Sequence, residues 1–93
     1  MDDEEKIIRQ RELKRRQEVN DLLAVLSLVE GRRLLYRLIV CSGALNQTTM
    51  TADALMTAFA EGKRWLGNEI LIDILEEQPQ LLKQMKQEYE REE

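Results

Sequence analysis

The longest stretch of helical periodicity in the sequence runs between Thr51 and Gln78. Its apolar residues recur every three or four positions, which is the spacing of one face of an α-helix. They are Leu55, Phe59, Leu66, Ile70 and Ile74, with Met56, Ala60, Gly67 and Leu71 widening the face. We expect Thr51 to cap this helix and the apolar face to be the main support of the core. Gly62 and Gly67 each cost about 1 kcal/mol relative to Ala inside a helix, so a neighbouring helix is expected to approach closely there.

A second helix is predicted from about Leu28 to Cys41. Ser27 and Glu30 have the spacing of a capping box, in which the serine oxygen accepts from a free backbone N–H and the glutamate reaches back. Gly43 follows the last apolar residue and can adopt the left-handed conformation that ends a helix. The residues expected to be buried are Leu34, Leu35, Leu38, Ile39 and Cys41.

A fourth helix is predicted after a loop from Gly43 to Thr51 and the long third helix. Pro79 suits the first turn of a helix, where its missing N–H is harmless. Leu81, Leu82 and Met85 are spaced to face inward.

The first 19 residues are predicted to form a charged helical arm, and residues 20–93 the core domain. Acidic residues come first and basic residues follow, an order that suits the helix dipole. The basic residues are Lys6, Arg9, Arg11, Lys14, Arg15 and Arg16. Apolar residues are too sparse there for a continuous stripe, so the arm is either a solvated or partner-bound helix or disordered when free. From Asn20 a dense apolar run begins.

Composition indicates an all-α fold of about four helices with a projecting, charged N-terminal helix. The chain is 43% hydrophobic and 34% charged, with four Gly and one Pro, which leaves little material for β-turns. A core built from 93 residues is marginal on its own. We therefore expect either a homo-oligomer or docking on a partner.

Charge and cysteine content restrict the protein's surroundings. A net charge of −4 argues against broad nucleic-acid affinity, which depends on Lys and Arg neutralising phosphates. The lone Cys41 cannot form an internal disulfide, and no signal peptide is recognisable, so synthesis inside a cell is expected. No apolar run approaches the roughly 20 residues that span a membrane, which predicts a soluble protein.

The residue types available for catalysis are few. The absence of His and the single Cys remove Cys–His nucleophilic pairs and His-containing zinc sites. Carboxylate pairs such as Glu69 with Asp73 are explained by solvated helix faces. The segment Glu61 to Arg64 lacks the first glycine of a phosphate-binding loop. We therefore predict no enzyme activity, no cofactor and no metal.

The candidate binding site is a set of arginines with neighbouring aromatic residues on the second and third helices. Its residues are Arg32, Arg33, Tyr36, Arg37, Lys63, Arg64 and Trp65. The arginines either pair with nearby glutamates as salt bridges of little net stability or bind acidic groups or phosphates of a partner. Trp65 is either an exposed binding anchor or a core residue covered by the first helix. The basic arm is likewise either a solvated face or a second binding element.

An ordered set of landmarks from about Asp21 to Glu92 resembles a family of small tailed-bacteriophage proteins whose prototype comes from a Bordetella podophage. The landmarks are the segment Asp21 to Ser27, Glu30 to Arg33, Cys41 with Gly43, Ala58 to Arg64, and Pro79 with Met85 and Glu88. Val29 stands where the family often has Pro, which softens the helix start without moving it. Trp65 stands where the family tends to be polar, so any role of Trp65 is expected to be particular to this chain.

The resemblance implies a phage accessory protein encoded among head and packaging functions. We expect it to bind virion components such as the portal, the tail adaptor or an internal ejection protein, in the host cytoplasm during assembly and in the virion if it is retained. The alternative is a nucleic-acid-binding or packaging-regulatory factor that uses Lys6 to Arg16 against phosphates, with strong salt dependence.

Overall fold

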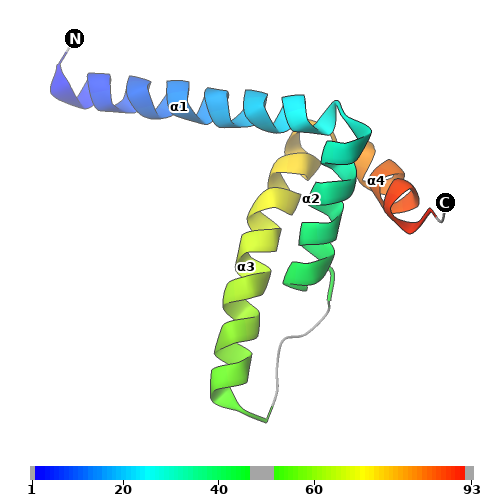
Figure 1. Cartoon of the computed structure of the whole chain (residues 1–93). Coiled ribbons are helices and arrows are strands. Elements are labelled where there is room, and N and C mark those ends of the chain that lie inside the picture. Colours follow the sequence, from blue (N-terminus) through cyan, green and yellow to red (C-terminus); the bar gives the residue numbers. More distant parts are fainter. Residues whose placement is uncertain (1, 47–51, 92–93) are drawn as a thin grey trace.

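The computed structural model describes residues 2–46 and 52–91, and in these residues it contains four α-helices and no strand. The helices are α1 (Asp3–Leu26), α2 (Val29–Ser42), α3 (Ala54–Glu77) and α4 (Leu81–Glu90). The predicted all-α class with four helices is therefore confirmed (Figure 1).

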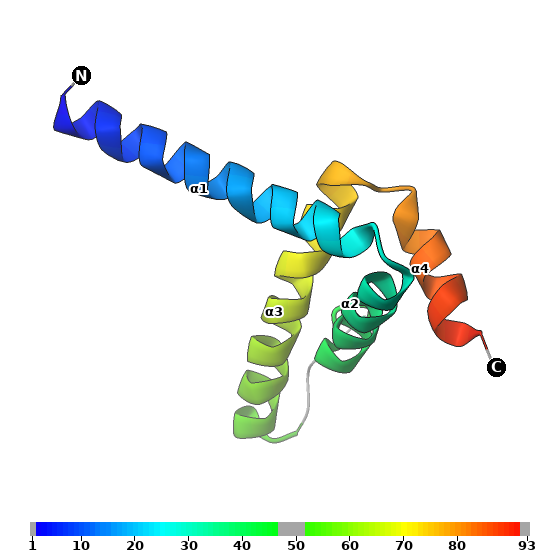
Figure 2. The ribbon, with the colours of Figure 1, turned by 45° about the horizontal axis from the view of Figure 1, so that its top comes forward.

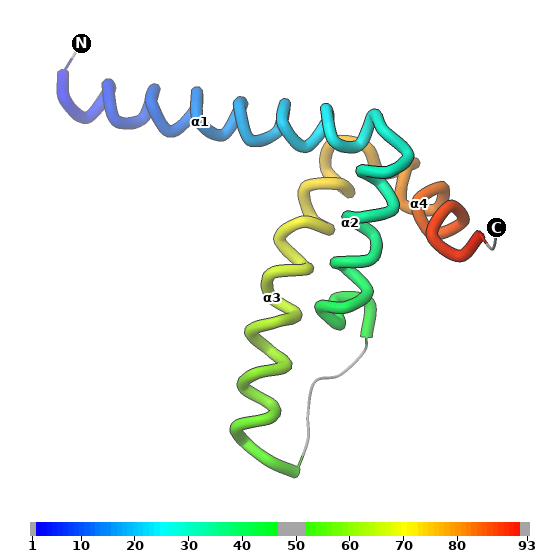
Figure 3. The backbone as a smooth tube through the Cα atoms, in the orientation of Figure 1, coloured from blue at the N-terminus to red at the C-terminus, as the bar shows by residue number. Residues whose placement is uncertain are grey.

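The helices are arranged as an antiparallel pair with two attachments. α2 and α3 lie side by side and run in opposite directions, and α4 packs against the opposite side of α2 (Figures 1 and 2). α1 crosses the C-terminal end of α3 and projects away from the pair, as the backbone trace in Figure 3 shows. The radius of gyration is 16.6 Å, compared with about 12 Å for a compact domain of this length. The molecule is therefore far more extended than a globular domain.

Side chains cap two of the helix starts. Asp2 accepts a hydrogen bond from the Glu5 amide (2.8 Å) at the start of α1, where acidic residues also suit the helix dipole. Asp53 accepts from the amides of Leu55 (2.8 Å) and Met56 (3.4 Å) at the start of α3. The predicted cap, Thr51, lies outside the described residues. A cap at Thr51 would make Ala52 the first helical residue, whereas α3 begins two positions later, at Ala54.

The predicted capping box between α1 and α2 is wrong. The Ser27 hydroxyl donates to the Ala24 carbonyl (2.6 Å), so this side chain closes α1 and does not cap α2. The N-cap of α2 is Leu28, an extended residue (φ −107°, ψ 136°) whose side chain makes no capping hydrogen bond.

α1 continues unbroken from the predicted arm into the body, through the expected boundary at residue 19. That boundary falls where α1 changes from exposed residues to the partly buried Val19 and Leu22.

The other predicted helix ends are close to the observed ones. Gly43 has φ 79° and ends α2 in the left-handed conformation, as expected. Pro79 lies in the turn before α4, whose first residue is Leu81. Leu81 and Leu82 are partly buried and Met85 is fully buried, which agrees with the predicted inward face of this helix.

The core lies at one end of the helix pair. Its buried apolar residues are Leu26, Tyr36, Ile39, Ala44, Ile74 and Met85. These side chains come from the end of α1, from α2 and the turn after it, from the second half of α3, and from α4. Side chains of Leu22, Leu35, Ile70, Leu71, Leu81 and Leu82 pack around them.

Several residues predicted to be buried are exposed. On α3, Leu55, Phe59 and Leu66 are 82%, 66% and 60% exposed, because they point about 80–120° around the helix from Gly67, which faces α2, and no described element covers them. On α2, Leu34 (47%), Leu38 (44%) and Cys41 are exposed as well. Ile39 is fully buried and Leu35 partly buried, as predicted, and Tyr36, which was predicted as a binding residue, is buried as well.

One of the two helix glycines marks a close approach between α2 and α3. A Cβ at Gly67 would collide with the side chain of Ser42 and lie 3.1 Å from the Ala44 Cβ. Gly67 is therefore needed for this contact, as expected. At Gly62, a Cβ would meet no described atom within 4 Å, so the expectation fails there among the described residues.

Candidate interaction surfaces

Arg32 joins three helices at the packed end of the molecule. Its Nε donates to both carboxylate oxygens of Glu88 on α4 (3.0 and 3.3 Å), and its Nη1 donates to the Leu26 carbonyl at the end of α1 (2.8 Å). The side chains of Arg32 and Glu88 are only 11% and 17% exposed. These bonds use the Nε–H and one Nη1–H of the guanidinium group and tie α2 to both neighbouring helices, so Arg32 acts here as a structural clamp.

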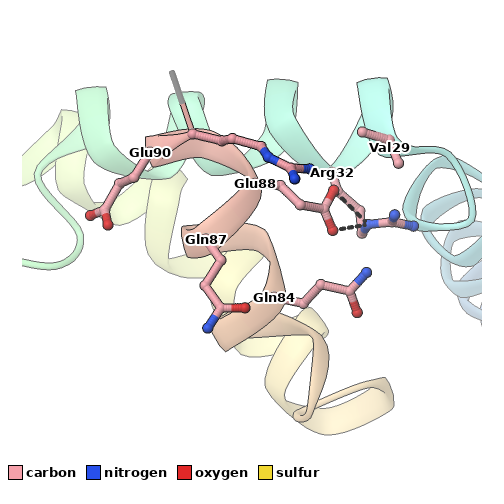
Figure 4. Close-up of a pocket in the computed structure, with 7 residues that line it drawn as sticks. Val29, Arg32, Gln84, Gln87, Glu88 and Glu90 are labelled. Atoms are coloured by element: carbon pink, nitrogen blue, oxygen red, sulfur yellow. Dashed lines mark hydrogen bonds and ion pairs between the residues drawn. The ribbon is translucent and has the colours of Figure 1, made fainter. Parts of the chain in front are cut away.

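An open groove lies beside this clamp, between the start of α2 and α4. Figure 4 shows the Arg32–Glu88 pair on one side and the amide side chains of Gln84 and Gln87 on the α4 side. Glu90 and Arg91 also line the groove. Two basic and two acidic side chains leave no net charge there, so the groove has no strong preference for an anion or a cation.

Tyr36, another predicted site residue, is part of the core. It is 5% exposed, and its ring centroid lies 5.2 Å from that of Tyr89 on α4 with the planes tilted by 49°. Burial raises the pKa of the Tyr36 hydroxyl, and the negative charge of Glu90 adds to the effect. Its neutral ring therefore holds α4 against α2.

The two remaining arginines of α2 lie on the side of this helix that faces α4. Arg33 is partly buried and Arg37 is exposed, and both line a shallow groove with Glu30, Leu34 and Tyr89. The groove thus combines two guanidinium groups with one carboxylate and the apolar side chains of Leu34 and Tyr89, which leaves it a net charge of +1.

The predicted residues on α3 lie farther along the helix pair. Because Gly67 is level with Ser42, Arg37 and Arg64 are separated along the helix axis by eight residues' rise, about 12 Å. Trp65 is 63% exposed, so α1 does not cover it. Lys63 Nζ lies 5.7 Å from the centre of the Phe59 ring, and Arg64 Nε is buried with no hydrogen-bond acceptor among the described residues. The structure thus places the predicted residues in two groups and not in one compact patch.

The basic residues of α1 form the second predicted binding element. Arg15 holds α1 against α3 through a bidentate ion pair with Asp73 and also contacts Glu18 (3.5 Å). The hydrogen bond and charge of Asp73 raise the pKa of Arg15. The side chains of Lys6, Arg9, Arg11, Lys14 and Arg16 are exposed. Five cations are therefore presented to solvent on the projecting part of the helix.

α3 carries an exposed apolar stripe, whose residues were predicted to be in the core. Leu55, Phe59 and Leu66 lie on one side of the helix, with Gly62 between them. On the same helical face, Asp73 binds Arg15 of α1. The periodicity of these residues was the available signal, and it identified a contact face without identifying what the face contacts.

Fold and surface together define a small all-α protein with a long projecting helix. Residues 2–46 and 52–91 contain no group of three or more His, Cys, Asp or Glu placed to hold a metal ion. Within these ranges, no helix has the length and apolar content needed to cross a membrane.

The chain matches the Bbp19-like phage protein family over residues 22–87 and belongs to this family. The match begins near the point where α1 enters the core and includes all of α2 and α3. No curated protein and no solved structure matches the chain. The resemblance inferred from the sequence landmarks is therefore confirmed, and the chain is a phage protein.

Proposed function

We propose that this phage protein is a non-enzymatic accessory protein that docks on another component of the phage particle through α1. The candidate partners are the portal, the tail adaptor and an internal ejection protein. Docking would take place in the host cytoplasm during assembly, with the protein retained in the virion where its partner is. Membership in a phage protein family and the shape of the fold support this proposal.

The projection of α1 is the observation that carries the proposal. Every residue from Asp3 to Glu18 is exposed, and the helix is tied to the body only near Arg15 and beyond. A helical segment of this length is marginal in water when nothing packs against it. Ile7, Ile8 and Leu13 are about half exposed (48%, 51% and 52%) among the basic side chains. Binding to a partner would cover these apolar residues and order the segment.

The charges of α1 indicate the chemistry of the partner surface. Arg11 and Lys14 lie on one side of the helix and Arg9 about 140–160° around it, so contact is expected with a groove that surrounds the helix and not with a flat patch. Carboxylate groups in such a groove would form charge-assisted hydrogen bonds with the guanidinium groups. The groove formed by Arg33, Arg37 and Tyr89, together with Trp65, provides further contacts for a large partner.

A binding measurement with purified phage components tests this function. The full chain is titrated separately against the portal, the tail adaptor and the ejection protein by calorimetry at low and high salt. A variant with Arg9→Glu, Arg11→Glu and Lys14→Glu is expected to bind at least about tenfold more weakly, since charge pairs steer and hold such contacts. A matched variant with Gln10→Ala and Gln17→Ala should bind normally. Equal affinity of the charge-reversed and native chains would refute docking through α1.

A nucleic-acid-binding role is the second candidate, and the five exposed cations of α1 favour it. It predicts affinity for duplex DNA that falls steeply with salt, because bound cations release counterions. Fluorescence anisotropy with labelled DNA at several salt concentrations tests it on the same three-residue variant. The overall charge of −4 opposes this role, and lack of DNA binding at moderate salt would eliminate it.

A further inference from the structure

The surface area of the molecule exceeds that of a compact monomer. The accessible surface is 7405 Å², compared with about 5,600 Å² for a folded monomer of this mass. The excess of about 1,800 Å² is more than twice the roughly 800 Å² that each partner buries in an interface of standard size. The chain therefore has enough unburied surface for one standard interface in addition to docking through α1.

The apolar stripe of α3 is symmetric in its spacing. The midpoint of the stripe lies between Gly62 and Lys63. Phe59 and Leu66 lie at equal distances on either side of this point, and so do Leu55 and Ile70. When two such helices lie antiparallel about that point, Phe59 of each copy faces Leu66 of the other, and Leu55 faces Ile70. A two-fold interface requires this reciprocity, in which one residue contacts a second and the second contacts the first.

The rest of the fold accommodates a second helix in this position. α1 crosses α3 at Asp73, on the stripe's own side, and then projects away, which leaves an open corner between the two helices (Figures 1 and 2). In the antiparallel register, the start of α3 in the second copy, Ala54, lies opposite Leu71 of the first copy. The second helix therefore stops short of Asp73, where Arg15 ties α1 to α3. Asp53 of the second copy then lies opposite Ile72, next to the Arg15–Asp73 ion pair. A parallel arrangement would instead bring the two α1 helices together at one end.

We propose that the stripe formed by Leu55, Phe59 and Leu66, continued by the exposed edge of Ile70, which also packs against the core of its own chain, is the interface of a homodimer in which α3 pairs antiparallel with α3 of a second copy. The bare backbone at Gly62 lies at the centre of the interface, where the two helices approach most closely. The contact is apolar, so it resists salt, in contrast to docking through the basic residues of α1. The two interfaces use different faces, and failure of one leaves the other intact.

The first test is the mass of the full chain in solution, measured by light scattering over a range of concentrations at low and high salt. The expected result is twice the chain mass of 10.9 kDa in both salts. A monomer at every concentration would overturn the proposal and would leave the stripe for a different occupant.

Two adjacent residues provide a matched pair of variants. Leu66 lies on the stripe and is 60% exposed, whereas Trp65 is 63% exposed and points about 100° away around the helix. Leu66→Glu is expected to weaken dimerisation at least about tenfold and Trp65→Glu to leave it unchanged, with helix content by circular dichroism the same in both. Equal masses of the two variants would place the interface elsewhere and refute the proposal.

Cysteine crosslinking tests the orientation, in a Cys41→Ser background. Gly62→Cys places two thiols near the dyad and should give a covalent dimer on mild oxidation. Leu55→Cys should not, because the two thiols are separated by 15 residues of helix rise, about 22 Å, and a disulfide requires Cβ atoms about 4 Å apart. Crosslinking at Leu55 would show a parallel pair and overturn the antiparallel register.

Discussion

The two halves of α3 contain similar numbers of apolar residues but have opposite surroundings. In the second half, Gly67 and Ile74 are buried against α2 and its neighbours, whereas in the first half Leu55 and Phe59 face solvent. Two causes combine. α2 has 14 residues and α3 has 24, a difference of about 15 Å at 1.5 Å per residue, and Leu55 and Phe59 point about 80–120° around the helix from Gly67, which faces α2. Apolar content therefore does not determine burial here, because burial requires a second element long enough to cover the face.

The largest expected contrast between the halves comes from truncating one apolar residue in each. Ile74→Ala should lower the free energy of unfolding by about 2–5 kcal/mol, because it leaves a cavity in the core. Phe59→Ala should change it by less than about 0.5 kcal/mol at the lowest measurable concentration, since its side chain is already solvated. Urea unfolding followed by circular dichroism measures both. Similar losses in the two variants would mean that the first half of α3 is covered within one chain.

Replacing each of the two glycines of α3 by Ala should change the stability of the chain in opposite directions. Gly67→Ala should destabilise the fold by about 1–3 kcal/mol, because the new methyl group collides with Ser42 and forces α2 away. Gly62→Ala should stabilise a single chain by about 1 kcal/mol, since Ala is the better helix former and the described surroundings are open. Melting temperatures of the two variants relative to the native chain, measured at the lowest usable concentration so that single chains are compared, should therefore shift in opposite directions. A loss of stability in both would contradict the open environment of Gly62.

Removing the clamp at the packed end should have an intermediate effect. Arg32→Ala leaves the Leu26 carbonyl and the Glu88 carboxylate without their donor, which should cost about 1.5–3 kcal/mol of unfolding free energy. Arg37→Ala, at an exposed residue of the same helix, is the control and should change it by less than about 0.5 kcal/mol. The double variant Arg32→Met with Glu88→Leu should recover part of the loss, because apolar residues can replace a buried ion pair. If Arg32→Ala and Arg37→Ala behaved alike in urea unfolding, the structural role of Arg32 would be wrong.

The smallest effect is expected from pH. Burial raises the pKa of Tyr36 above its ordinary value of 10.0, so the folded state holds the proton more tightly than the unfolded state. The resulting stabilisation is complete below that ordinary value and is lost as the pH rises through the raised pKa. Unfolding free energies measured from about pH 9 to about pH 11 should fall more steeply for the native chain than for Tyr36→Phe. Identical slopes would show that the hydroxyl is solvated.

The sequence was sufficient to predict the helices because their ends depend on local chemistry. Gly43 ended α2 where expected, and Pro79 separated α3 from α4. The Ser27–Glu30 capping box failed because a serine between two helices can bond either way, and Ser27 bonds back to Ala24. Neighbouring residues alone do not decide between these two bonds.

The sequence pattern did not predict which helices pack against one another. Periodicity identified a face on α3, but which part of it α2 covers depends on how the helices align. The same holds for Arg32 and Tyr36, which were candidates for a binding surface and instead contact Glu88 and Tyr89, more than 50 residues away in the chain. The exposure of Trp65 follows from the path of α1, which the sequence pattern does not specify.

The two attachments of α1 make its first part a cantilever. Leu28 is the extended residue before α2, Arg32 braces the joint through the Leu26 carbonyl, and the Arg15–Asp73 ion pair fixes α1 to α3 a second time. The overhang that remains before Arg15 is 12 helical residues, about 18 Å long. Because two attachments set its direction, the overhang presents all its sides to a partner at a set distance from the body.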